Sequence, residues 1–154
     1  YFGTLSVALS LGLVCPALAQ DTAQNTGQNT GQPAPDSKIT LELNGAADTE
    51  AGGCQLTIVA TNRLDKGIKR AAWQVAIFDK AGAVQSLPIL DFGTMMSGKT
   101  RVGLFPLPDR PCAQIGRIVV NDVAECSAED DSDLRDICLG GLATQTRTDI
   151  DFGL

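Results

Sequence analysis

The feature that most constrains the fold is an alternation of apolar and polar residues with a period of two. It begins at Lys38, where Ile39, Leu41 and Leu43 alternate with polar side chains. Successive side chains of a strand point to opposite faces of a sheet, so this pattern predicts strands with one buried face. Comparable segments lie at residues 56–60, 73–77, 84–90, 100–104, 115–123 and 142–150.

Turn residues separate these segments. The run Asp79-Lys80-Ala81-Gly82 predicts a hairpin turn, because Asp opens such turns and Gly supplies a positive φ. Pro88 indicates an edge strand or a bulge. Only residues 132–139 suggest a helix, of about one turn. The sequence therefore predicts an all-β fold, a single disulfide-stabilised Ig-like or related β-sandwich of about six to seven strands over residues 38–154.

The segment before Lys38 predicts export. Residues 5–14 are apolar and Ala17-Leu18-Ala19 fits a signal-peptidase site, so residues 1–19 are interpreted as a signal peptide truncated at its start. An uncleaved anchor and a lipoprotein modified at Cys15 are the alternatives. Residues 20–37 are polar, repeat the tetrapeptide Gln-Asn-Thr-Gly and predict a flexible linker. No stable membrane span is expected after cleavage.

Cleavage after Ala19 removes Cys15 and leaves an even set of cysteines: Cys54, Cys112, Cys126 and Cys138. In an oxidising compartment four cysteines predict two disulfides, and the protein is expected to be periplasmic or secreted. Three connectivities are possible and the sequence alone does not choose among them. We favour Cys126 with Cys138, which closes a short acidic loop, and Cys54 with Cys112, which ties distant strands.

Composition excludes several classes of function. The chain has no histidine, which removes Ser-His-Asp and Cys-His catalysis and weakens any zinc site. The net charge is -6. An acidic chain repels phosphate backbones, so nucleic acid is not an expected partner.

Residues 93–100, Gly-Thr-Met-Met-Ser-Gly-Lys-Thr, match the P-loop pattern in full. A P-loop needs a helix that begins at the lysine, because its N-terminal amides hold the phosphates. Here Arg101-Val102-Gly103-Leu104-Phe105-Pro106 follows and alternates like a strand. We therefore expect a turn that enters a strand, and no nucleotide binding.

Two charged clusters are candidate sites. The acidic one could hold calcium or supply catalytic carboxylates, but its spacing does not fit an EF-hand. The basic one, between the second and third predicted strands, could dock an acidic partner and would make the molecule bipolar. The acidic loop comprises Glu129, Asp130, Asp131, Asp133 and Asp136, and the basic cluster, a possible partner surface, comprises Arg63, Lys66, Lys69 and Arg70.

Cys54, Trp73 and Cys112 follow the order of the immunoglobulin cysteines and tryptophan. A true immunoglobulin domain would carry a tyrosine two residues before the second cysteine, and that place holds Arg110. Trp73 is predicted to lie in the core of a related sandwich.

Several stretches together resemble a group of small, uncharacterised exported alphaproteobacterial proteins. They are residues 73–82, the Gly-Lys-Thr of 98–100 with Val102 and 104–105, Cys112, residues 115–123, and the cysteines 126 and 138. The run Ile77-Phe78-Asp79-x-x-Gly82 also resembles FxLYD-type domains of bacterial envelopes. The resemblance covers residues 38–140 and implies a sandwich with paired cysteines and a Gly-Lys-Thr at the start of a strand. It implies no catalytic residues.

These observations favour an exported, non-enzymatic module that binds or supports an envelope protein, without a metal or cofactor. Sheet edges offer a route for such binding by strand addition. The alternative is a small hydrolase or calcium-dependent protein that uses Asp122 or the acidic loop. That alternative predicts a concave site with a carboxylate of raised pKa.

Overall fold

The computed structural model describes residue 3 and residues 38–154. Apart from Gly3, the predicted signal peptide (residues 1–19) and the predicted linker (residues 20–37) lie outside the described residues. Within the described part, no helix has the length and apolar character needed to cross a membrane.

In the described residues nine strands form two sheets, accompanied by a 3-10 turn and one short helix. In chain order they are β1 (Ile39–Asp48), β2 (Cys54–Asn62), β3 (Ile68–Asp79), β4 (Val84–Ser86), β5 (Ile89–Met95), β6 (Thr100–Leu107), η1 (Cys112–Gln114), β7 (Ile115–Ala128), α1 (Arg135–Gly140), β8 (Leu142–Thr146) and β9 (Asp151–Gly153).

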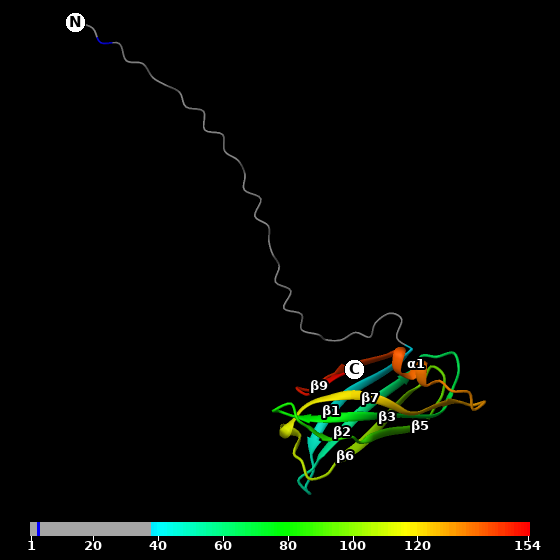
Figure 1. The fold of residues 1–154 in the computed structure, drawn as a ribbon, viewed down its shortest axis with the longest axis horizontal. Helices are drawn as coiled ribbons and strands as arrows, with labels where there is room; N and C mark the ends of the chain where they lie inside the picture. Colours follow the sequence, from blue (N-terminus) through cyan, green and yellow to red (C-terminus); the bar gives the residue numbers. More distant parts are fainter. Residues whose placement is uncertain (1–2, 4–37) are drawn as a thin grey trace.

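The two sheets pack face to face, which confirms the predicted all-β sandwich (Figure 1). Sheet A has the order β6-β2-β1-β8. Sheet B has the order β4-β3-β7-β9, and β5 pairs with the same side of β3 as β4 does. Most neighbours are antiparallel, whereas β8 and β9 join β1 and β7 in parallel.

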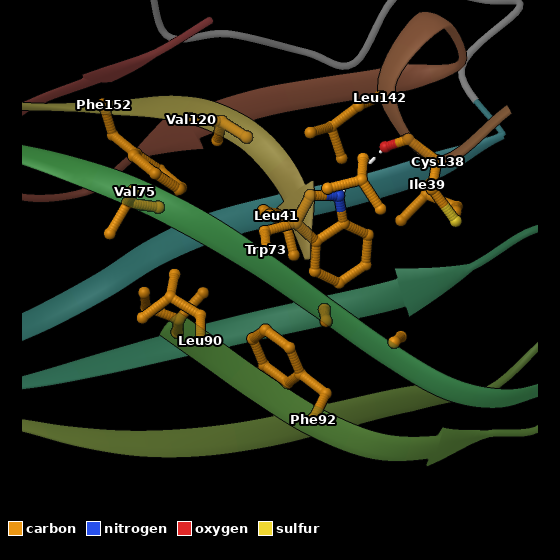
Figure 2. Packing of buried hydrophobic residues seen from close by; sticks show 14 of the residues in the cluster. Ile39, Leu41, Trp73, Val75, Leu90, Phe92, Val120, Cys138, Leu142 and Phe152 are labelled. Atoms are coloured by element: carbon orange, nitrogen blue, oxygen red, sulfur yellow. Dashed lines mark hydrogen bonds between the residues drawn. The ribbon is translucent and has the colours of Figure 1, made fainter. Parts of the chain in front are cut away.

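The core lies between the sheets and is built from the predicted alternation. β2 shows the alternation cleanly, because every second residue from Cys54 to Asn62 is buried. Trp73 occupies the centre of the core, fully buried, and meets Phe92 edge to face with ring centroids 5.9 Å apart. Its indole N–H donates a hydrogen bond of 3.0 Å to the backbone carbonyl of Cys138 (Figure 2). The prediction that Trp73 is a core residue is therefore confirmed.

Two disulfides close the fold at different places. Cys54 at the start of β2 pairs with Cys112 in η1, with Cα atoms 4.8 Å apart. Cys126 near the end of β7 pairs with Cys138 in α1, with Cα atoms 6.4 Å apart. These are the two pairs that the sequence analysis favours. The second bond attaches α1 to sheet B, beside the carbonyl that receives the Trp73 hydrogen bond.

The hairpin turn at 79–82 is also present. Gly82 has a φ of 85°, and the side chain of Asp79 accepts hydrogen bonds from the backbone N–H groups of Ala81 and Ala83, both at 2.9 Å. Asp79 fixes the turn, and Gly82 adopts the left-handed backbone that other residues avoid.

Two predicted strands are each divided in the structure. Residues 84–90 form β4 and the start of β5, separated at Leu87-Pro88, because proline cannot donate to a ladder. Residues 142–150 were expected to form one strand. Instead, β8 ends at Thr146 in sheet A, and the chain crosses to sheet B before β9 begins at Asp151.

Candidate functional site

The edges of the two sheets are the natural places for another chain to bind, because an edge strand presents unpaired backbone groups. Sheet A ends in β6 and β8, and sheet B ends in β9 and in the β4–β5 side. Strand β6 forms one border of the sandwich (Figure 1). No strand in the described part of the chain pairs with its outer edge.

The register of β6 shows which of its backbone groups are free. The N–H of Asn62 donates to the carbonyl of Lys99 at 3.0 Å, so these two residues form a hydrogen-bonded pair. The β2–β6 register continues from there without a shift, and bonded and non-bonded pairs alternate along antiparallel strands. The N–H and C=O groups of Thr100, Val102 and Leu104 must therefore point away from β2.

Pro106 agrees with this assignment. It lies two residues beyond Leu104, so its backbone nitrogen also faces away from β2, and it pairs in register with Gln55 of β2. A proline is accepted in a sheet where its missing N–H would face outward. The outer edge of β6 thus offers three N–H donors, followed by one position that cannot donate.

The side chains around these free groups are apolar. Val102 and Leu104 lie on the outer face of sheet A and are each 59% exposed. On the inner side, Gly103 lets the ring of Phe105 fold back along the strand, since a Cβ at position 103 would lie 2.5 Å from that ring. Phe105 meets Phe92 edge to face with centroids 5.1 Å apart. An incoming strand would find apolar groups on both faces.

The other edges carry features that oppose pairing. The β4–β5 side is interrupted at Pro88, and its register with β3 shifts twice near Gly93, which has a φ of 63°. It also carries Asp91, paired with Arg70. Strand β9 has three residues and β8 has five. Short, bulged or charged edges are the usual protection against unwanted pairing, and the eight residues of β6 carry such features only at Arg101 and Pro106.

Sequence reasoning did not select this edge, although a sign of it is present. The strand 100–107 is apolar at 103, 105 and 107, which face the core, and also at 102 and 104, which face outward. An edge strand needs only one apolar face, so apolar residues on both faces indicate a second contact. That β6 lies at an edge could not be known before its neighbours were known.

The four predicted basic residues lie together at one end of the sandwich, where two of them form ion pairs. Lys69 binds Asp131 at 2.5 Å, and Arg70 binds Asp91 at 2.6 Å and Glu125 at 3.3 Å. Hydrogen bonds and charge from these carboxylates raise the pKa of both cations.

Arg63 and Lys66 form no ion pair with a described residue. Because β3 runs antiparallel to β7, the basic cluster lies beside the acidic loop. The molecule therefore lacks the bipolar charge distribution that was expected from the sequence. The basic surface is partly neutralised.

The acidic loop does not gather its carboxylates around a common point. Asp131 is directed at Lys69, and Asp130 accepts a hydrogen bond of 2.6 Å from the Ser132 hydroxyl. The side chain of Arg135 binds Asp133 and lowers the pKa of that carboxyl to about 2. Among the described residues, no three His, Cys, Asp or Glu side chains are arranged to hold a metal ion.

Asp122 lies near this loop. Together with Asp133, Arg135 and Asp136 it lines a hollow of about 430 Å³ beside α1. Its side chain accepts a hydrogen bond of 2.8 Å from the N–H of Val123. The guanidinium of Arg135 lines the same hollow, so the acids there share it with a cation.

A second polar cluster lies on the outer face of sheet A and centres on Glu42, which is 8% exposed. Its carboxylate accepts hydrogen bonds from Asn44 at 2.7 Å, Gln145 at 2.5 Å and Arg147 at 2.8 Å. Burial alone raises the pKa of Glu42, but these donors outweigh burial and hold the pKa below its ordinary value. The cluster stays ionised and joins β1 to the end of β8.

The P-loop pattern lies across a turn, as expected from its sequence context. Gly93 to Met95 end β5, and Thr100 begins β6. Gly98 has a φ of 68°, and Lys99 N–H donates to the carbonyl of Met96 at 3.2 Å, which closes the turn. No helix follows Lys99, so the backbone lacks the phosphate cradle of a P-loop.

Comparison of the chain with models of known protein families, with curated proteins and with solved structures finds no match. The interpretation of the site therefore rests on its own geometry and chemistry.

Proposed function

We propose that this protein is an exported, non-enzymatic module that binds an envelope protein by accepting an extended segment of it at the outer edge of β6. The observation that carries the proposal is the row of outward N–H and C=O groups at Thr100, Val102 and Leu104, flanked by two exposed apolar side chains. Backbone hydrogen bonds would supply affinity, and the neighbouring side chains would supply selectivity.

Two disulfides support a location outside the cytoplasm, because such bonds persist in oxidising compartments. Four carboxyl groups are held in their charged form. The pKa is lowered at Glu42, Asp91, Asp130 and Asp133 by donors that favour the charged form. A general acid needs the opposite shift.

The test uses a photo-crosslinking amino acid placed at Val102 in intact cells that produce the protein. The matched control places it at Val84, which is 54% exposed on the β4 edge. We expect one abundant adduct from position 102 and none from position 84. Leu104→Pro in the same chain should abolish the adduct, because it removes an outward N–H and leaves the β2–β6 hydrogen bonds intact.

Equal adducts from both positions would contradict binding at β6. An adduct from position 102 that persists with Leu104→Pro would contradict strand addition. The thermal unfolding temperature of each variant, measured alongside, establishes that the domain is folded.

A further inference from the structure

The charge along β6 and the turn before it differs from that of the whole molecule, and this difference indicates what β6 would accept. The chain has a net charge of -6, yet residues 96–108 contain Lys99 and Arg101 and no carboxylate; Asp91 of β5, which acts electrostatically on Arg101, is already paired with Arg70. Both cations are exposed. Resting on the function proposed above, we infer that the segment bound at β6 has alternating apolar residues followed by carboxylates that face Arg101 and Lys99.

The register of an added strand fixes this order. Its residues opposite Val102 and Leu104 would share the outer face of sheet A, where both side chains are more than half exposed. Its intervening residues would share the inner side with Arg101, whose Nη1 donates to the carbonyl of Thr94 at 3.2 Å. Arg101 is thereby held beside the edge, where a carboxylate on the added strand could reach it. Lys99 follows two residues further along the same side.

A second copy of this chain does not fit the edge as well. Two β6 strands related by a two-fold axis would place Lys99 and Arg101 of both copies along one shared ladder. Four cations would lie within a few residues of one another, with no carboxylate from either β6 strand. Like charges at such separations repel at physiological ionic strength. An acidic partner segment removes this repulsion and replaces it with attraction.

The probe is a synthetic peptide with the palindromic sequence Glu-Thr-Glu-Val-Thr-Val-Glu-Thr-Glu, which presents the same side chains in parallel and antiparallel orientations. A matched peptide replaces every Glu by Lys, and a third carries N-methyl groups on the three amides of the central Val-Thr-Val, which blocks pairing in both orientations. The long-range charge of the protein favours the lysine peptide, whereas the local charge at β6 favours the glutamate peptide. Binding measured by fluorescence anisotropy therefore separates the two effects.

We expect the glutamate peptide to bind about tenfold more tightly than the lysine peptide, since two exposed ion pairs each contribute modestly. The N-methylated peptide should not bind. The double variant Lys99→Glu/Arg101→Glu should lose about tenfold in affinity. The control variant Arg63→Glu/Lys66→Glu changes the net charge by the same amount, but in the basic cluster. It should bind the glutamate peptide as tightly as the native protein does. Amide exchange should show new protection at Thr100, Val102 and Leu104.

The outcomes separate this inference from the proposed function. If both charged peptides bind equally and the N-methylated peptide does not bind, strand addition stands and the acidic partner is overturned. If the native protein forms a dimer in analytical ultracentrifugation that Leu104→Pro dissociates, the occupant is a second copy and the inference also fails. If the glutamate peptide does not bind at millimolar concentration, the inference is overturned, while the crosslinking from Val102 still decides the proposed function.

Discussion

The two disulfides should contribute unequally to stability, because they close loops of very different length. Cys54 and Cys112 are separated by 58 residues, and Cys126 and Cys138 by 12. In the loop-entropy model, the longer loop stabilises the fold by about 4.2 kcal/mol and the shorter by about 2.8 kcal/mol. The difference comes from the logarithm of the loop-length ratio and amounts to about 1.4 kcal/mol.

The perturbation is a pair of double variants, Cys54→Ala/Cys112→Ala and Cys126→Ala/Cys138→Ala. Each loses two sulfur atoms, and three of the four cysteines are fully buried or nearly so, which makes the packing losses comparable. The free energy of unfolding from urea denaturation, monitored by Trp73 fluorescence, should fall further for the first variant. Small domains have only about 5–15 kcal/mol of stability, so either loss is large.

A larger loss for the Cys126–Cys138 variant would refute the loop-entropy reasoning. It would mean that the attachment of α1 to sheet B matters more than the restriction of the unfolded chain. Intact mass after alkylation, with and without reduction, is the accompanying control. It should show no free thiol in the native protein and none in either double variant, because each variant keeps the other disulfide.

Three further predictions concern single side chains. Trp73→Phe should lower the free energy of unfolding by about 3 kcal/mol in urea denaturation followed by circular dichroism, because it leaves the buried Cys138 carbonyl without its donor and opens a cavity. Gly103→Ala should cost about 1–3 kcal/mol by the same measurement, because its Cβ would displace the ring of Phe105. The lowered pKa of Glu42 means that its contribution to stability is present above pH 4.5, the ordinary value, and is lost as the pH falls through the folded value. Thermal unfolding from pH 7 to pH 3 should accordingly show a smaller loss for Glu42→Gln than for the native protein.

Local patterns were enough to predict most of the strands. The alternation around Leu41 and the turn at Asp79 act through neighbours in the sequence, and both are present in the structure. The division at Pro88 was also indicated, since a proline interrupts any ladder that needs its N–H. The sequence did not indicate the break after Thr146, because nothing in residues 142–150 shows that the chain passes from one sheet to the other.

The charged clusters show the limit of sequence reasoning about sites. Lys69 and Asp131 are 62 positions apart in sequence, yet the antiparallel pairing of β3 with β7 makes them an ion pair. A basic cluster that looks free in the sequence is therefore half neutralised. Lys99 and Arg101 lie at the start of the edge strand β6, but in the sequence Lys99 matches the lysine of the P-loop pattern, and nothing there indicates a sheet edge.

The sequence by itself determined the all-β class, the buried faces and the place of Trp73, because side-chain alternation and turn chemistry are local properties of the chain. It narrowed the cysteine pairing to three choices and favoured the one observed. Only the tertiary structure decided that β6 is an edge, that its outward amides have no partner among the described residues, and that β8 and β9 lie in different sheets. The physical reason is that an edge is defined by which strand is missing beside it, and strand order depends on contacts between residues far apart in the sequence.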